Sequence, residues 1–284
     1  MPPRVVIYQV RQHHRSRVVC EAMAAGLRAH GLRFDVAWAD QYAGPTHDIA
    51  IFYGLESKLG RALADYPAAG RHAFYIDLGY FGRREGGRWC GYHKIVLDGR
   101  HPTPYFLAVK PRVARFRRFG IVVRSWRARG RHIVLAGMGD KGARADGFEP
   151  EAWEMQALRE IRQYTNRDVI YRPKPSWKKA RPLPGCGYSP ASQDCAAVLA
   201  EAWAVVTHHS NVAVDGLLGG IPAFCWEGVA MPMASQSLAE IEAPRMPEGR
   251  EAWAEAIAHT QWNIREMHNG EAWAHCREVL LSCT

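Results

Sequence analysis

The stretch AVVTHHSNVAVDGLLGGIPAFCW, residues 204–226, decides the fold because it contains a strand, a turn, a helix and a second strand in one run. Residues 204–208 are apolar or β-branched, as in a buried strand, and the apolar residues within 212–218 recur at helical spacing. Gly219 and Gly220 end the helix, and Pro222 prevents it from resuming before the next strand. Such a unit is typical of a parallel sheet covered by helices.

The turn between this strand and this helix consists of His209, Ser210 and Asn211. A helix N-terminus at that place presents unpaired N–H groups and a partial positive charge, both of which favour a phosphate. We therefore expect these three residues to contact the phosphates of a ligand. A capped βαβ unit without a ligand is the alternative interpretation.

The same run resembles the donor-binding half of GT-B glycosyltransferases, in which the helix carries an acid-x-x-x-x-Gly-x-Pro pattern. Here Asp215, Gly220 and Pro222 form that pattern. The resemblance implies that the acid holds the nucleotide ribose and that the turn backbone holds the diphosphate. The family commonly has Glu-Ala where this chain has Asp215-Gly216, so the shorter side chain leaves the reach to the ribose open.

Length and pattern together predict two domains. The 284 residues, 48% of them hydrophobic, suffice for two cores, and strands alternate with helices in both halves. This predicts two Rossmann-like α/β domains, which the resemblance places facing each other across a cleft. Residues 1–127 are expected to form the acceptor-side domain, and residues 128–284 the domain that binds the nucleotide-sugar. In the second domain, Ser192 is expected to be a helix N-cap. Closing helices are expected at 250–268 and 270–282, and the last of them is able to pack back across the first domain.

Four further residues of the second half are candidate donor contacts. The glycine-rich segment after strand 131–140 fits neither the dinucleotide nor the P-loop pattern, which disfavours a dinucleotide enzyme or a kinase. The resemblance implies that this loop faces the diphosphate through Gly139 and Lys141. Arg172 and Lys174, at the end of another expected strand, could stabilise the leaving diphosphate without a metal.

A general base is expected near the end of strand 72–80, where Asp77 is the one acid in an apolar segment. Burial raises the pKa of a carboxyl toward the range that suits a base. A salt bridge to a nearby arginine is the alternative, and His13 and His101 are rival bases. A base serves an inverting reaction, and the sequence leaves inversion and retention both open.

Basic residues are concentrated in one segment of a chain whose net charge is +9. Nine of them lie between Lys110 and Arg131, with no acid among them, which indicates polyanion binding, although a solvated basic face is the alternative. Aromatic residues nearby could stack on bases. The candidate acceptor or nucleic-acid contacts are His14, Arg15, Arg83, Arg84, Arg88, Trp89, Tyr92, Arg100, Arg115, Arg117 and Arg118.

The segments YIDLGYFGR (75–83), AGMGDKG (136–142) and YRPKP (171–175) resemble bacteriophage proteins related to glycosyltransferases. The resemblance implies a metal-independent glycosyltransferase that moves a sugar from a nucleotide-sugar, a UDP-sugar being the first choice, to a hydroxyl group. The basic first half favours double-stranded phage DNA as the partner, with a hydroxymethylated pyrimidine as acceptor. The alternatives are transfer to a cell-envelope polysaccharide and a nonenzymatic DNA-binding protein on a transferase-like scaffold.

Composition also bears on location and cofactors. No apolar run approaches the roughly 20 residues that span a bilayer, and the first ten residues lack the apolar region of a signal peptide. We therefore expect a cytoplasmic protein, in the host cytoplasm if a phage encodes it. The seven cysteines form no C-x-x-C pair, which predicts free thiols, no metal site and no cofactor besides the nucleotide-sugar.

Overall fold

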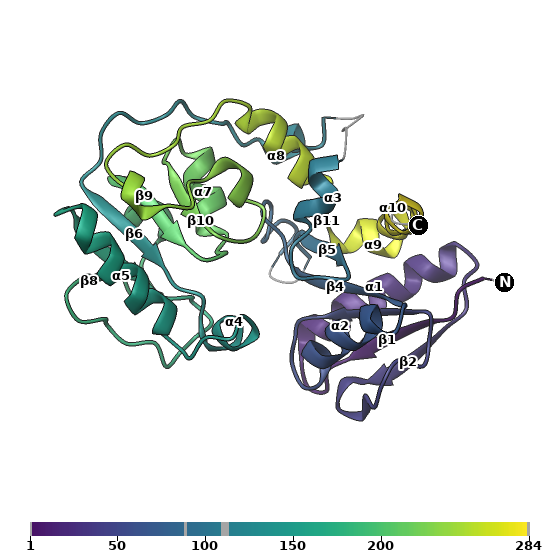
Figure 1. The fold of residues 1–284 in the computed structure, drawn as a ribbon. Helices are drawn as coiled ribbons and strands as arrows, with labels where there is room; N and C mark the ends of the chain where they lie inside the picture. Colours follow the sequence, from purple (N-terminus) through teal and green to yellow (C-terminus); the bar gives the residue numbers. More distant parts are fainter. Residues whose placement is uncertain (1, 88–89, 109–113, 283–284) are drawn as a thin grey trace. The chain divides into compact units, whose positions relative to one another are not determined.

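The computed structural model describes residues 2–87, 90–108 and 114–282, which form two compact units. Unit 1 contains Met1–Phe119 and Glu255–Thr284, and unit 2 contains Gly120–Ala254. Each unit is an α/β layer structure around its own sheet (Figure 1). The predicted fold class, two Rossmann-like α/β domains, is therefore present.

The sheet of unit 1 has six strands in the order β11-β5-β4-β3-β1-β2. Four of them, β2, β1, β3 and β4, are parallel, whereas β5 is antiparallel to β4 and β11 is antiparallel to β5. The long apolar runs became β1, β3 and β4 because helices cover both of their faces. The bounds are β1 (Val5–Gln9), β2 (Phe34–Trp38), β3 (Ile49–Tyr53), β4 (His72–Leu78), β5 (His93–Leu97) and β11 (Gln261–Trp262).

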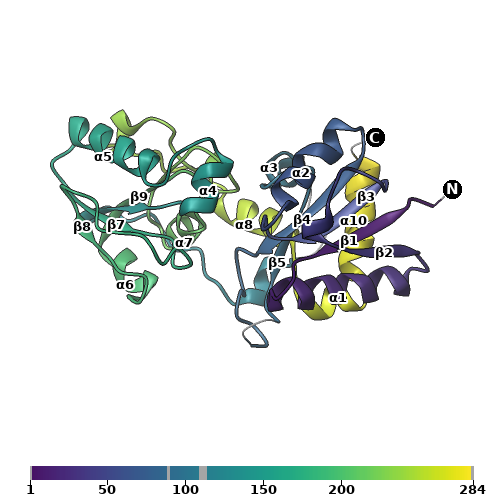
Figure 2. The ribbon, with the colours of Figure 1, turned by 90° about the horizontal axis from the view of Figure 1, so that it is seen from below.

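Helices cover both faces of this sheet, and the alternation of side chains along each strand supplies two cores. Ile7 and Ile51 face a core shared with α1, α9 and α10, while Tyr8 and Phe52 face a core shared with α2. Figure 2 shows α1 and α2 on opposite sides of the strands. The helices of unit 1 are α1 (His14–Ala29), α2 (Leu59–Ala68), α3 (Thr103–Ala108), α9 (Ile264–His268) and α10 (Glu271–Ser282).

The last thirty residues correct the predicted division of the chain, which assigned them to the second domain. They supply β11, α9 and α10 to unit 1, and α9 packs closely on α1. A Cβ atom at Gly26 of α1 would lie 2.2 Å from the carbonyl oxygen of Met267, so glycine is what permits this approach. Unit 2 is thus inserted into unit 1.

The predicted helix 250–268 is interrupted, which is a second correction. Residues Arg250–Ala258 form α8, which leads from unit 2 into unit 1, and Gln261 and Trp262 then pair as β11 with β5. The side-chain oxygen of Gln261 accepts the backbone N–H groups of Tyr80 at 2.6 Å and Phe81 at 3.1 Å. This tertiary pairing overrides the helical pattern of the sequence.

The sheet of unit 2 has five parallel strands in the order β10-β9-β6-β7-β8. α5 contributes Trp153, Leu158 and Ile161 to the core on one face, and α7 packs on β9 and β10 (Figure 1). The strands are β6 (His132–Ala136), β7 (Asp168–Arg172), β8 (Gly187–Tyr188), β9 (Ala202–Thr207) and β10 (Ala223–Cys225). The helices are α4 (Asp140–Ala145), α5 (Ala152–Tyr164), α6 (Cys195–Leu199) and α7 (Val212–Leu218).

The stretch 204–226 folds as predicted, into the end of β9, then α7 and β10. Gly220 has φ +76°, and a Cβ atom there would lie 2.0 Å from the carbonyl oxygen of Ser125. The segment before β6 therefore packs against the end of α7 and belongs to unit 2, so the chain changes unit at Phe119 rather than at 127. The predicted cap at Ser192 is wrong, because α6 begins at Cys195 with Asp194 as its N-cap.

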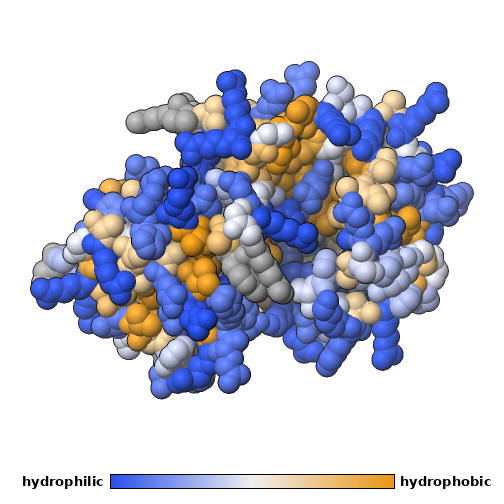
Figure 3. Space-filling model, turned by 180° about the vertical axis from the view of Figure 1, so that it is seen from behind, coloured by the Kyte–Doolittle hydropathy of each residue, from blue (hydrophilic) through white to orange (hydrophobic). Residues whose placement is uncertain are grey.

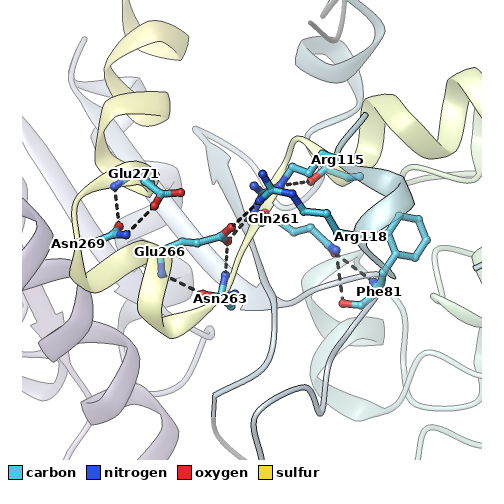
Figure 4. A network of polar contacts seen from close by, with 9 residues as sticks. Phe81, Arg115, Arg118, Gln261, Asn263, Glu266, Asn269 and Glu271 are labelled. Carbon is cyan, nitrogen blue, oxygen red and sulfur yellow. Dashed lines mark hydrogen bonds and ion pairs between the residues drawn. The ribbon is translucent and has the colours of Figure 1, made fainter. Parts of the chain in front are cut away.

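A buried ion pair joins the two segments of unit 1 (Figure 4). The guanidinium of Arg115, 6% exposed, donates to Glu266 at 2.6 Å and to the carbonyl oxygen of Gln261 at 3.0 Å. Glu266 also accepts the backbone N–H of Asn263 at 3.0 Å, closing a capping box at the start of α9. The carboxylate of Glu266 therefore binds both Arg115, from the first segment of unit 1, and the N-terminus of α9, from the second segment.

One face of the molecule shows the distribution of polar and apolar side chains. On the face drawn in Figure 3, hydrophilic side chains predominate and hydrophobic ones occur in small groups. Among the described residues, none of the helices is both long enough and apolar enough to cross a membrane.

Replacing Glu266 with Gln should lower the free energy of unfolding by about 3 kcal/mol, because it leaves the buried guanidinium of Arg115 facing a neutral amide. Urea titration of both proteins measures the change. The matched control is Glu271→Gln at the exposed start of α10, which should change stability by less than about 1 kcal/mol. Equal losses in the two variants would contradict this role of Glu266.

Stability should fall as the pH drops from 6.5 toward 4. Burial first, and then the positive charge of Arg15, lower the pKa of His93 to about 4, so the folded chain does not take up the proton that the unfolded chain binds. The slope is at most about 1.4 kcal/mol per pH unit for this histidine. Burial likewise lowers the pKa of His275 to about 4.

Urea titrations across that range measure the slope. His93→Gln should flatten it, and His14→Gln, at an exposed position, should not. A slope that His93→Gln leaves unchanged would show that this histidine does not remain neutral in the folded chain.

Candidate functional site

The order of strands in unit 1 places a switch point between β1 and β3, because β2 lies on one side of β1 and β3 on the other. Ligands of open α/β sheets bind where the loops after two such strands diverge. Here these loops carry His13 and Glu56, whose Nε2 and Oε1 atoms lie 3.9 Å apart. We call His13, Arg15, Tyr53, Glu56 and Asp77 the unit 1 edge.

His13 caps α1, and its Nδ1 atom accepts the backbone N–H of Ser16 at 3.0 Å. This cap accounts for the start of α1 at His14. With the lone pair of Nδ1 engaged, the proton of a neutral ring lies on Nε2, which then donates rather than accepts. His13 is thus suited to donate a hydrogen bond, and its predicted role as a base loses support.

Arg15 reaches from α1 to Tyr53 at the end of β3, with 3.4 Å between the guanidinium and the hydroxyl oxygen. Burial first, and then the negative charge of Asp77, raise the pKa of Tyr53 to about 12. The ring of Tyr53 lies edge-on to that of His93, with 5.8 Å between centroids. Three neighbouring strands therefore contribute side chains to the same edge.

Asp77, the predicted base, lies near the end of β4 and is held by two hydrogen bonds. Its Oδ2 atom accepts the hydroxyl of Tyr75 at 2.7 Å, and its Oδ1 atom accepts the backbone N–H of Leu78 at 2.8 Å. Burial and the charge of Asp77 raise the pKa of Tyr75 and of Tyr80 well above its usual range. The carboxylate is therefore half-buried and fixed in direction among protonated hydroxyls.

The remaining bases and acceptor contacts predicted from the sequence differ in their burial and in their hydrogen bonds. His101 is half-buried between β5 and α3, and Arg100 accepts a hydrogen bond from Lys94 through its carbonyl oxygen at 2.6 Å. Arg83 donates to the carbonyl oxygen of Tyr80 at 3.0 Å. The exposed residues are His14, Arg84, Arg117 and Arg118, whereas Arg88 and Trp89 lie outside the described residues.

Two of the predicted acceptor contacts are wrong because they are buried. Arg115 is engaged by Glu266 and stacks on Trp262, with 4.2 Å from the guanidinium carbon to the ring centroid. Tyr92, 4% exposed, packs edge-on against Phe119 with 4.7 Å between centroids and offers no face to a base. Arg115 and Arg118 both lie near Glu266, an acid distant in the chain, which a count of charges within the basic segment could not reveal.

Unit 2 has a switch point of its own between β6 and β9, since β7 lies on the far side of β6. Thr207 ties the two loops together there. Its hydroxyl donates to the carbonyl oxygen of Ala136 at 2.8 Å and accepts the backbone N–H of Ser210 at 3.1 Å. The loops after β6 and β9 are consequently held side by side.

The turn 209–211 differs in detail from the open phosphate site that the sequence predicted. The hydroxyl of Ser210 accepts the backbone N–H of Val212 at 3.3 Å, so hydroxyl groups of the chain occupy two of the expected donors. Asn211 is the N-cap, and α7 has only seven residues, which limits its dipole. Asp215 lies half-buried in the first turn of α7.

Gly139 and Lys174 lie together at the ends of β6 and β7. Gly139 has φ +78°, and a Cβ atom there would lie 3.2 Å from Cδ of Lys174, so a side chain would be strained and crowded. Lys141 and Lys174 are exposed. Arg172 is 6% exposed and donates to Ser189 and to the carbonyl oxygen of Gln193, each at 2.8 Å, so it orders the following loop and its predicted donor role is corrected.

A cluster that the sequence analysis missed lies beside this turn. Nε2 of His209 lies 3.1 Å from Oδ2 of Asp146, and Nδ1 of His208 lies 3.7 Å from the same oxygen. His209 was predicted as a phosphate contact and His208 as the end of a strand. Only tertiary structure brings Asp146, which ends α4, to them, although the adjacent histidines were a signal for metal or acid–base chemistry.

Next to His208 is a hollow of about 240 Å³ with aromatic walls. Phe148, Trp153 and Trp226 line it, and Gln156 and Glu160 contribute polar groups. Glu154 does not line the hollow but is fully buried nearby in α5, where it accepts the backbone N–H of Met138 at 2.9 Å. Burial raises the pKa of the Glu154 carboxyl. The hollow combines apolar walls and a few polar groups, as small-molecule sites do.

Comparison with known proteins relates the fold to sugar transferases. No protein-family model matches the sequence, and no curated protein matches it by sequence. The KpsC β-Kdo 2,4-transferase of Thermosulfurimonas dismutans superposes with a TM-score of 0.54 and 10% identity over 93% of this chain and 96% of the other. The KpsC β-Kdo 2,7-transferase of the same organism gives 0.52 and 12% over 94% and 99%. These neighbours are GT-B glycosyltransferases, so the fold is the GT-B fold of two Rossmann-like domains.

Proposed function

We propose that this chain is a glycosyltransferase that moves a sugar from a nucleotide-sugar to a hydroxyl group of a glycan. The observation that carries the proposal is the similarity of fold to two sugar transferases over 93% and 94% of the chain. The polar residues at the switch point of each sheet support it, because that is where α/β sheets bind ligands. Unit 2 binds the donor, and unit 1 activates the acceptor.

The donor diphosphate lies at the loop after β6 in this proposal. Gly139 lets a phosphate approach the backbone, and the exposed ammonium groups of Lys141 and Lys174 supply positive charge. Such cations stabilise the charge that develops on a leaving diphosphate. Asp215 holds the ribose, and UDP-sugars are the first donors to test.

Asp77 is the proposed general base of an inverting transfer. Its two hydrogen bonds fix the carboxylate, while Tyr53, Tyr75 and Tyr80 surround it with groups that stay protonated. The acceptor hydroxyl loses its proton to this carboxylate as its oxygen bonds to the anomeric carbon and the nucleoside diphosphate leaves. Arg15 and His13 then donate hydrogen bonds to the acceptor.

A glycan is the favoured acceptor because both structural neighbours are Kdo transferases. The case for DNA rested on basic and aromatic residues of unit 1, and Arg115 and Tyr92 are buried. DNA with hydroxymethylated pyrimidines is the competing acceptor. Transfer of labelled sugar to Kdo-containing oligosaccharides, compared with transfer to such DNA, decides between them.

Donor binding should raise the melting temperature of the chain. At a concentration about 100 times Kd, a ligand of the folded state adds about 2.7 kcal/mol, which corresponds to a shift of several degrees. Thermal-shift measurements with UDP-, GDP-, ADP- and CMP-sugars test this, and no shift with any of them would contradict the proposal. Lys174→Ala should reduce the shift, whereas Lys178→Ala, an exposed lysine in the same loop, should not.

Asp77→Asn should slow sugar transfer by about 100-fold or more, the usual contribution of a general base, without changing the donor-induced thermal shift. Initial rates with a donor that gives a thermal shift measure the loss. Asp40→Asn, an exposed partner of Arg11, is the control and should keep the wild-type rate. If Asp77→Asn kept the wild-type rate, Asp77 would not be the base and His101 would be the next to test.

A further inference from the structure

We propose that Asp146, His208 and His209 bind one divalent transition-metal ion of the zinc type. They offer one carboxylate oxygen and two imidazole nitrogens, and the three atoms all lie within 4.8 Å of one another. Two nitrogens with one oxygen suit zinc and its neighbours, whereas magnesium and calcium prefer oxygen ligands alone. The proposal concerns ion binding and does not rest on sugar transfer.

The distances between the ligand atoms match such an ion. Bonds of roughly 2.1 Å at tetrahedral angles place two ligand atoms about 3.4 Å apart. The distances from Oδ2 of Asp146 are 3.1 Å to Nε2 of His209 and 3.7 Å to Nδ1 of His208, one on either side of that value. Small rotations of the three side chains suffice to centre an ion.

The surrounding structure holds the three ligands in place. The backbone N–H of Asp146 donates to the carbonyl oxygens of Gly142 and Ala143 at the end of α4. The ring of His208 packs edge-on against Phe148 and Trp153, with 5.6 and 5.7 Å between centroids. Its carbonyl oxygen accepts two backbone N–H groups from the segment after β10. Ligands fixed by packing and hydrogen bonds form an organised metal site.

Burial separates this cluster from ordinary histidine–aspartate pairs. The Asp146 side chain is 4% exposed, and those of His208 and His209 are 11% and 13% exposed. A buried carboxylate requires compensating positive charge, which an ion supplies. The pairs His47–Asp35 and His72–Asp98 instead join one imidazole to one carboxylate at 2.8 and 2.7 Å, with more exposed acids.

Three protein ligands leave a coordination position for water or for an oxygen of a bound molecule. His208 also lines the aromatic hollow, so a ligand there would lie beside the ion. The same ion would fix the loop after β9 to the end of α4.

Metal content of the full-length chain tests the proposal. After removal of metals with a chelator and dialysis, isothermal titration with zinc should show one site per chain, and zinc should raise the melting temperature. His208→Gln, His209→Gln and Asp146→Asn should each weaken binding about tenfold or more. His47→Gln, which removes the histidine of a pair whose carboxylate is exposed, should bind zinc as the wild type does.

Circular dichroism and melting of the metal-free variants show whether each is folded. If a variant does not fold, the visible spectrum of the cobalt(II)-loaded wild-type chain decides: intense bands indicate four or five ligands and support the site, and weak bands of hydrated cobalt overturn it. Zinc uptake by His208→Gln equal to that of the wild type, or no uptake by the wild type, would also overturn the proposal.

Discussion

The ion pair between Arg115 and Glu266 is the contact on which the architecture depends. Arg115 lies just before the chain leaves unit 1, and Glu266 lies just after it returns. Because both side chains are almost fully buried, separating them would leave charge in an apolar environment. The pair thereby joins the segment in which the chain leaves unit 1 to the segment in which it returns, and residues Gly120–Ala254 between these segments form the second, inserted unit.

The returning segment also contacts residues next to the unit 1 edge. The side-chain amide of Gln261 donates to the carbonyl oxygen of Phe81 and accepts the backbone N–H groups of Tyr80 and Phe81. These two residues follow Asp77 by only a few positions. β11 also extends the sheet beyond β5, which carries His93. Positioning of the proposed base therefore involves residues from the far end of the sequence.

The sequence predicted most strands and the two α/β cores, because apolar runs such as those of β1, β3 and β9 reflect burial on both faces. It did not reveal β11, since two residues in a helical pattern pair through tertiary contacts alone. Arg115 was assigned to a nucleic-acid surface because its acid, Glu266, is distant in the chain. The Asp146 cluster was missed for the same reason, whereas the turn at His209 was found through its local pattern.

The insertion of unit 2 between the two segments of unit 1 affects the order in which the units can fold during translation. Synthesis runs from the N-terminus, so the whole of unit 2 emerges before Gln261 and Glu266 exist to complete unit 1. Until Gln261 and Glu266 have been synthesised, Arg115 has no Glu266 to pair with, and the edge of β5 that β11 later covers is exposed. Unit 2, although encoded later, is the part that can finish folding first, and the N-terminal sheet is the part that most needs protection from aggregation during translation.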